Sequence, residues 1–212
     1  MPVVQRRIRE KEVRRRQILD AAREIFFEKG FEKTTVDDIA QATELSKGAI
    51  YLYFPSKEEI YICLMTEGAA ILYNMLKKAV DVDLPADTLL RRLGHSYYSF
   101  YRDYPNYFRM MFLYYSSQEI HSKVTKDLNC KCEEQAKKSL MLVAEVIQKG
   151  VDDRLFKACN PWDYALMTWA GINGIILLGE KREPENLNLH TSIERLHDVF
   201  LESTIVALKH GR

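Results

Sequence analysis

The chain of 212 residues has room for one sizeable domain, or for a small domain joined to a larger one, and its 47% of apolar residues is typical of globular proteins. Its longest apolar run, residues 166–179, is 14 residues long and contains Asn173, so it is too short to cross a bilayer. The chain does not open with a charged region followed by an apolar one, so we expect a reduced, cytoplasmic setting for its four cysteines. Composition thus argues against a membrane protein and against a secreted disulfide scaffold.

Positive charge is concentrated at the start of the chain. The net charge is +1, whereas residues 1–57 hold 12 Lys or Arg against 9 Asp or Glu, a balance of +3. Between residues 6 and 16, seven basic side chains are accompanied only by Glu10 and Glu12. Such a stretch attracts a polyanion through counterion release, but solvated basic ends are also common on proteins that bind nothing. The sequence alone leaves both interpretations open.

The first predicted helix covers residues 10–29. Ile18, Ile25 and Phe26 lie on one apolar stripe at helical spacing. Gly30, followed by a phenylalanine, suits the left-handed residue that ends many helices, because glycine carries no Cβ and the aromatic ring supplies the usual hydrophobic contact.

Two short helices are expected next. The first begins after Thr35, whose hydroxyl suits the N-cap position, and ends near Glu44, and Ser46 is placed to cap the second. Steps of 100° per residue from Ser46 turn four side chains inward: Ala49, Ile50, Tyr53 and Phe54. The opposite face carries Lys47, Gly48, Tyr51 and Leu52. Plain core packing is the competing interpretation for the aromatic residues, and it is the one we favour for Phe54.

The rest of the chain also reads as helical. A longer helix is expected to begin at Lys57, because Ser56 and Glu59 have the spacing of a capping box. Beyond residue 80, glycines and prolines separate segments of helical periodicity, and no alternating strand pattern persists. The five predicted segments are 86–104, 106–115, 117–149, 161–178 and 190–209. The fold class is therefore predicted to be all-α, with about nine helices.

Two short helices joined by a tight turn and braced by a preceding helix form the unit that places its second helix in the DNA major groove. On the predicted exposed face, Lys47 can bind guanine acceptors or phosphate, and Gly48 allows the backbone to come close. Tyr51 offers a ring and a hydroxyl, and Leu52 can pack on a thymine methyl. Phosphate contacts are expected from Thr35, Tyr53 and Lys57.

Residues 26–60, FFEKGFEKTTVDDIAQATELSKGAIYLYFPSKEEI, resemble the pattern of the TetR family of transcription regulators, and the resemblance extends over about residues 14–62. It implies base reading by Lys47, Gly48, Tyr51 and Leu52, and phosphate contacts by Thr35, Tyr53 and Lys57. Two positions depart from the pattern. Glu44 replaces a usual turn glycine, so a left-handed backbone there would cost about 1 kcal/mol. Leu52 stands where a polar residue is frequent.

The resemblance also implies a domain plan and partners. Residues 1–56 are expected to form the DNA-binding domain, and residues 57–212 the effector-binding and dimerisation domain. The protein is expected to be a homodimeric repressor that binds a palindromic operator in double-stranded DNA, and whose operator affinity a small effector modulates. Two glycines and four apolar residues of the last two helices are the expected dimer surface: Gly171, Gly174, Leu178, Leu196, Phe200 and Ile205.

The segment 97–115, YYSFYRDYPNYFRMMFLYY, is unusually dense in aromatic residues. Aromatic side chains usually make core, but each buried tyrosine hydroxyl needs a partner, and apolar pockets use such groups to orient ligands. The stretch YRDYPNYFRMMF also resembles family members that respond to fatty acids or their coenzyme A thioesters, so the expected effector is small and apolar. The pocket candidates are Tyr97, Tyr101, Phe108, Phe112, Tyr115, Trp169 and Asn173.

An enzyme and a helical sensor that does not bind DNA are the alternative classes. The sequence has no phosphate-cradling glycine loop and no nucleophile elbow, and one Glu-x-x-His pair, Glu194 and His197, is fewer than a carboxylate metal site in a helical bundle requires. Neither catalysis, a metal nor a cofactor is therefore expected. A DNA-binding protein would differ from a sensor by a steep salt dependence of its affinity for duplex DNA.

Overall fold

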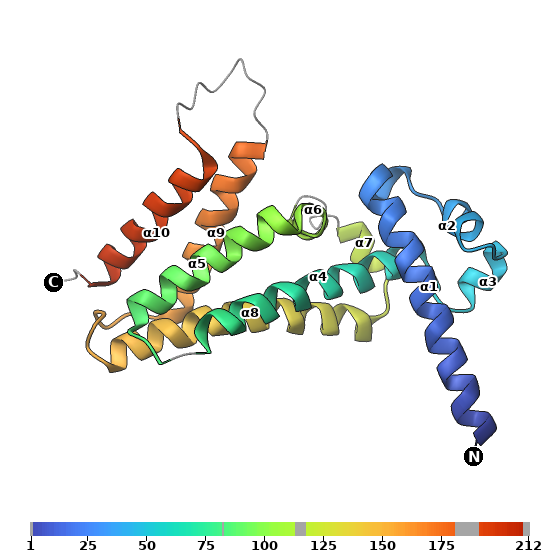
Figure 1. Cartoon of the computed structure of the whole chain (residues 1–212), viewed down its shortest axis with the longest axis horizontal. Coiled ribbons are helices and arrows are strands. Elements are labelled where there is room, and N and C mark those ends of the chain that lie inside the picture. Colours follow the sequence, from blue (N-terminus) through green and yellow to red (C-terminus); the bar gives the residue numbers. More distant parts are fainter. Residues whose placement is uncertain (1, 82, 113–117, 181–190, 210–212) are drawn as a thin grey trace. The chain divides into compact units, whose positions relative to one another are not determined.

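The computed structural model describes residues 2–81, 83–112, 118–180 and 191–209. Within these ranges the chain forms ten α-helices and no strand, which confirms the predicted all-α class (Figure 1). None of the described helices is both long and apolar enough to span a membrane. The helices are α1 (Pro2–Lys33), α2 (Val36–Ala42), α3 (Lys47–Tyr51), α4 (Lys57–Val80), α5 (Ala86–Asp103), α6 (Pro105–Phe112), α7 (Gln118–Ser122), α8 (Lys126–Asp152), α9 (Pro161–Glu180) and α10 (Ile193–Lys209).

Helix α1 is longer than the predicted segment 10–29, because its helical structure begins at residue 2. Four of the eight added residues are Arg or Gln, which have good helix propensity, and the proline stands at the first helical position, where it is tolerated. The regular helix stops where expected, since Gly30 has φ 76° and ψ 170°. Only glycine adopts this conformation without strain.

One predicted helix is wrong. The segment 117–149 is divided into α7 and α8 by residues 123–125, although no glycine or proline lies there. Tertiary contacts hold this break, since the Lys123 carbonyl oxygen accepts from Ser56 Oγ at 3.2 Å and the Thr125 N–H donates to Glu59 Oε1 at 3.2 Å. The side chain of Val124 between them is buried.

The chain forms two compact units. Unit 1 comprises residues 1–68 and 109–133, and unit 2 comprises residues 69–108 and 134–212, so α4, α6 and α8 contribute to both. These boundaries differ from the functional division expected at residue 57, which stays a prediction.

The core of unit 1 lies between α1, the two short helices and the first half of α4. Ile18, Ile39, Ile50 and Phe54 are fully buried in it. The hydroxyl of Tyr61 reaches the end of α6 and donates to the Met110 carbonyl oxygen at 2.9 Å, so this buried polar group is satisfied. The short helices are thereby fixed on a packed base.

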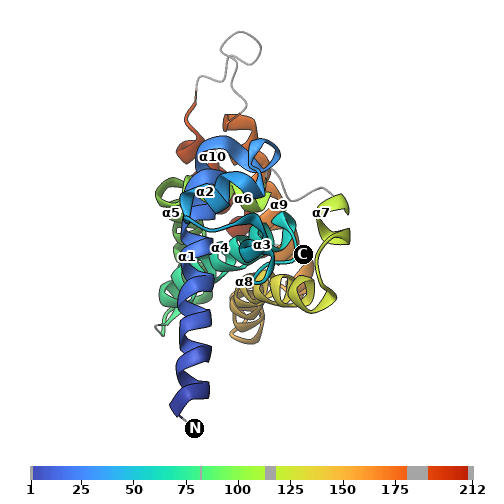
Figure 2. The ribbon, with the colours of Figure 1, turned by 90° about the vertical axis from the view of Figure 1, so that its right-hand side faces the viewer.

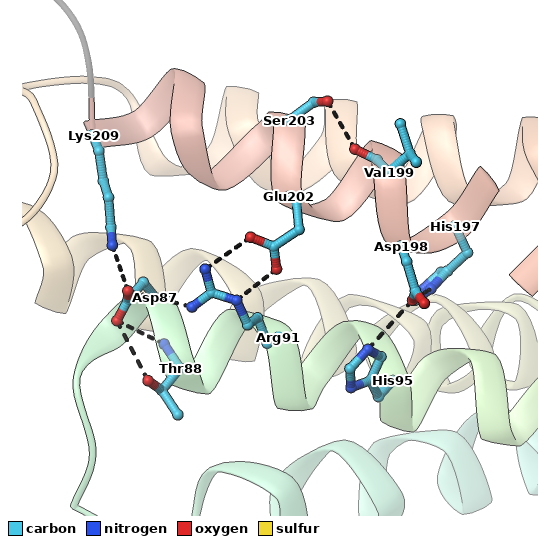
Figure 3. Close-up of polar contacts among 10 residues, drawn as sticks. All are labelled: Asp87, Thr88, Arg91, His95, His197, Asp198, Val199, Glu202, Ser203 and Lys209. Atoms are coloured by element: carbon cyan, nitrogen blue, oxygen red, sulfur yellow. Dashed lines mark hydrogen bonds and ion pairs between the residues drawn. The ribbon is translucent and has the colours of Figure 1, made fainter. Parts of the chain in front are cut away.

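In unit 2, helix α10 is held against α5 by close packing and by polar contacts (Figure 3). A Cβ added at Gly94 would lie 2.5 Å from Leu201 Cδ2, so a larger residue there would force the Leu201 side chain to shift. Arg91 binds both carboxylate oxygens of Glu202, at 2.6 and 2.8 Å. Lys209 pairs with Asp87 one turn before Arg91.

Candidate nucleic-acid interface and effector site

The two short helices of unit 1 are capped as the sequence predicts. The Thr35 hydroxyl accepts from the Asp38 N–H at 3.1 Å, and Ser46 Oγ accepts from the Ala49 N–H at 3.1 Å. Between the helices, the Leu45 N–H donates to the Ala40 carbonyl oxygen at 2.9 Å. Glu44 has φ 54°, so the left-handed turn that favours glycine is present with a side chain on it.

The outer face of α3 and its C-cap present the four residues that the sequence places there. Lys47, Gly48, Tyr51 and Leu52 are exposed, Leu52 by 78% and Tyr51 by 44%, whereas Ile50 is fully buried. Figure 2 shows α2 and α3 side by side next to α1. The face therefore combines a cation, a bare backbone position, an aromatic hydroxyl and an apolar side chain.

Lys47 has a partner within the chain that sequence reasoning missed. Its Nζ lies 2.8 Å from Oδ2 of Asp37 in the first turn of α2, and this hydrogen bond raises the pKa of Lys47. Both side chains are exposed, so solvent screens the pair. A phosphate or base that binds Lys47 must compete with the Asp37 carboxylate. Asp37 and Lys47 are ten residues apart and belong to different helices. Helical periodicity relates residues of one helix only, so the sequence did not indicate this pair.

Thr35 is also engaged. Both its N–H and its hydroxyl donate to Asp38 Oδ2, at 2.8 and 2.7 Å, in a complete capping box. Bonds from Thr35 and from Lys29 lower the pKa of Asp38 to about 2. A phosphate at this helix start would therefore find the donors of Thr35 occupied. The N–H groups of Val36 and Asp37, which have no acceptor within the helix, are the available backbone donors.

Lys57 closes the end of α1 in addition to beginning α4. Its Nζ donates to the carbonyl oxygens of Phe31 and Thr34, at 2.8 and 2.9 Å, and lies 4.2 Å from the centre of the Phe31 ring. An ammonium group has three N–H donors, so one remains for a phosphate. Tyr53, four residues before Lys57, is half-buried and packs against the core of unit 1.

Five of the seven predicted effector residues lie in unit 2. Tyr97, Tyr101 and Phe108 pack together, with ring centres of Tyr101 and Phe108 5.1 Å apart. The Tyr97 hydroxyl donates to Asn173 Oδ1 at 2.8 Å, and burial raises the pKa of Tyr97. The Asn173 amide in turn donates to the Trp169 carbonyl oxygen at 2.8 Å.

The other two candidates are not part of this group. Phe112 belongs to unit 1, and Tyr115 lies outside the described residues. Two surface hollows formed by described residues lie elsewhere: one is lined by α10 residues 198–207, and the other by residues of α8 and α9 that include Met141 and Trp162. The Tyr97 hydroxyl already has its buried partner, so a ligand would have to displace or extend this network.

Helices α9 and α10 leave apolar surface exposed, although not all at the residues named from the sequence. Phe200 fills the space over Gly171, where an added Cβ would lie 2.2 Å from its ring, and Ile205 is fully buried. Gly174 has open space above it, as predicted. The large apolar side chains exposed on the two helices are Trp162, Leu166, Met167, Trp169, Leu178, Val199 and Val206.

The chain is similar to known regulatory proteins in sequence and in fold. Residues 18–62 match the family described as bacterial regulatory proteins, tetR family. The HTH-type transcriptional repressor AcnR of Corynebacterium diphtheriae is 33% identical over 97 residues, which are 46% of this chain and 50% of AcnR. The chain spans half or less of the length of the first curated relatives that it matches.

Two solved structures resemble the chain over most of its length. FadR of Bacillus subtilis in complex with stearoyl-CoA is 21% identical with a TM-score of 0.71, and AibR in complex with isovaleryl coenzyme A and operator DNA is 18% identical with a TM-score of 0.66. Each alignment covers 90% of this chain and 97% of the other. At these identities the likeness shows a shared fold.

Proposed function

We propose, because the chain belongs to the TetR family of bacterial regulatory proteins, that it is a transcription regulator that binds operator DNA through the outer face of α3. The proposal rests on the exposure of Lys47, Gly48, Tyr51 and Leu52. The opposite side of α3 is buried in the core of unit 1 through Ile50. Base edges in the major groove can meet such a face directly. Repression is the proposed mode, in keeping with AcnR.

A homodimer is the proposed acting form. One α3 helix can contact only a few base pairs, whereas two copies related by a two-fold axis read two half-sites of a palindrome. The exposed apolar side chains of α9 and α10 support this proposal, because an apolar surface of this kind is usually covered by a partner. Gly174, with nothing within 4 Å of its Cβ position, leaves room for a second helix.

We further propose a small apolar effector, a fatty acid or an acyl coenzyme A thioester, bound among Tyr97, Tyr101 and Phe108. Support comes from this aromatic group with the buried hydrogen bond between Tyr97 and Asn173, because apolar walls with a few polar groups are typical of a ligand site. FadR and AibR were both solved with acyl coenzyme A molecules. Native mass spectrometry with palmitate, palmitoyl-CoA and free coenzyme A tests the proposal, and absence of binding to either acyl compound contradicts it.

The DNA-binding proposal is tested by selecting bound fragments from a random-sequence duplex pool and measuring affinity for the selected operator. The double variant Lys47→Ala with Tyr51→Ala should bind it at least tenfold more weakly, because a specific base contact contributes about 1–3 kcal/mol. The matched control Lys78→Ala with Tyr104→Ala removes the same exposed side-chain types from unit 2 and should leave affinity unchanged. The proposal is contradicted if the folded Lys47/Tyr51 variant binds the operator as tightly as the folded Lys78/Tyr104 control. It is also contradicted if binding by the wild type does not depend on salt.

A further inference from the structure

The first part of α1 projects from unit 1 as a free helix. All residues from 4 to 14 are exposed, including the apolar Val4 and Ile8, so no core holds this segment. Figures 1 and 2 agree that it runs past α3 and ends beyond the rest of unit 1. The structure thus shows a formed helix where the sequence left open a frayed end.

This helix carries cations that no acid of the described chain neutralises. Arg6 pairs with Glu10 at 3.0 Å. Arg15 at the base of the exposed helix donates to Cys63 Sγ at 3.2 Å. No ion pair within the described ranges involves the other five cations between residues 6 and 16: Arg7, Arg9, Lys11, Arg14 and Arg16. On α8, by contrast, Lys131 and Lys149 each pair with an aspartate four residues away.

The unpaired cations include a row on the side of α1 that bears the helix-turn-helix. At 100° per residue, Arg7, Lys11 and Arg14 fall within an arc of about 60° that also contains the direction of the buried Ile18. Arg15 marks the transition, since its guanidinium lies 4.4 Å from the centre of the Phe54 ring, three residues after the end of α3. The apolar face of α1 therefore continues as a basic face next to α3.

Like charges on this face oppose one another. Arg7 and Lys11 are four residues apart, and so are Lys11 and Arg15, a spacing at which equal charges destabilise a helix. A polyanion laid along the face would relieve this repulsion and release its own counterions at the same time. Charge complementarity therefore favours duplex DNA as the occupant.

We propose that residues 4–14 of α1 bind the phosphate backbone of the duplex immediately outside the half-site read by α3. The proposal rests on the proposed DNA-binding function and extends it. Eleven residues of helix are about 16 Å long, and a duplex carries one phosphate charge per about 1.7 Å of its axis. The segment can thus cover about five base pairs of flank and contact three phosphates through Arg7, Lys11 and Arg14.

The test compares the full-length wild type with Arg7→Gln/Lys11→Gln/Arg14→Gln on the selected operator, once trimmed to its half-sites and once with ten flanking base pairs on each side. On the flanked duplex, the variant loses three phosphate contacts from each of two protomers. The slope of log affinity against log salt should therefore become less steep by about 5, at about 0.9 per phosphate. On the trimmed duplex the two proteins should bind alike. Hydroxyl-radical footprints should show flank protection only with the wild type.

Two further variants keep the test decisive. Lys77→Gln/Lys78→Gln/Arg92→Gln removes the same charge from exposed positions of unit 2 and should keep the wild-type slope. Arg7→Lys/Lys11→Arg/Arg14→Lys preserves the charge and should also keep it. Equal slopes of wild type and Gln variant on the flanked operator overturn the flank contact while the proposed function stands. Absence of salt-dependent binding by the wild type overturns both.

Discussion

Three basic or hydroxyl side chains assigned to DNA from the sequence already have partners within the chain. Lys47 pairs with Asp37, Thr35 is bound by Asp38, and Lys57 donates to two carbonyl oxygens at the end of α1. A phosphate must compete with each of these partners. Lys57 is the hardest to release, because the Phe31 and Thr34 carbonyl oxygens would both lose a charged donor. Its main effect is therefore to position the α1 end against α4.

Replacement of Glu44 by glycine should stabilise the protein by about 1 kcal/mol, because glycine adopts the left-handed conformation without the clash of a Cβ. Chemical denaturation of both proteins measures the difference. Arg154, with φ 59°, is the other non-glycine residue with positive φ in the described chain, and Arg154→Gly offers an independent comparison in unit 2. A less stable Glu44→Gly protein would show that the Glu44 side chain contributes more than the backbone strain costs.

Replacement of Asp37 by asparagine should tighten binding to any duplex a few-fold, because Lys47 loses its competing carboxylate and the surface proposed to face DNA loses a negative charge. Discrimination between operator and random duplex should fall, since phosphate attraction carries no sequence information. Anisotropy titrations on both duplexes measure this. Asp127→Asn, which breaks the exposed pair with Lys131 on α8, is the matched control and should change neither affinity.

At the scale of elements, short helices depend on their ends more than on their length. Helix α2 has seven residues and α3 has five, too few for stability in isolation. Caps at Thr35 and Ser46 and a buried inner face keep both in place. The Asp38 carboxylate completes the cap of α2 by accepting from Thr35 and from Lys29 Nζ at 2.9 Å.

This cap gives a pH prediction. The pKa of Asp38 is lowered to about 2 from a model-compound value of 3.8, so its contribution to stability is complete above about pH 4 and is lost as the pH falls toward 2. Thermal melts of the wild type and of Asp38→Asn should therefore differ most near pH 5 and converge toward pH 2. A constant difference over this range would show that the carboxylate charge is not the source of the stabilisation.

At the scale of the whole molecule, the exposed apolar surface on α9 and α10 is of the kind that a partner usually buries. Helix α9 is rich in apolar residues on all its sides, as a buried helix is, yet Leu166, Met167 and Leu178 are exposed in the single chain. The polar contacts between α5 and α10 stabilise this surface from behind and hold it in a defined shape (Figure 3). We therefore expect the interface of the proposed dimer here.

The double variant Leu178→Glu with Val206→Glu should be monomeric at concentrations where the wild type is a dimer, because association would bury unpaired carboxylates. Sedimentation equilibrium gives the dissociation constants of the dimers. Operator affinity should fall as dimerisation is lost. Val13→Glu places one glutamate on an equally exposed apolar position of α1 and should leave the dimer intact. A wild type that is monomeric throughout contradicts the proposal.

Sequence periodicity anticipated local features because their causes are local. The glycine stop at Gly30 and the outward side of α3 follow from one residue's backbone or from steps of 100° along a helix, whereas the left-handed turn at Glu44 was expected from the family resemblance. The break at residues 123–125 could not be predicted in this way, because groups on Ser56 and Glu59 more than sixty positions earlier hold it.

By itself, the amino-acid sequence determined the all-α class, the capped helix pair and the outer face of α3, since helix propensity, caps and apolar spacing act over a few residues. Only the tertiary structure decided that Asp37 holds Lys47, that Lys57 closes α1 and that Phe200 fills the space over Gly171. These contacts join residues from different helices, and their formation depends on how the packed elements bring side chains together.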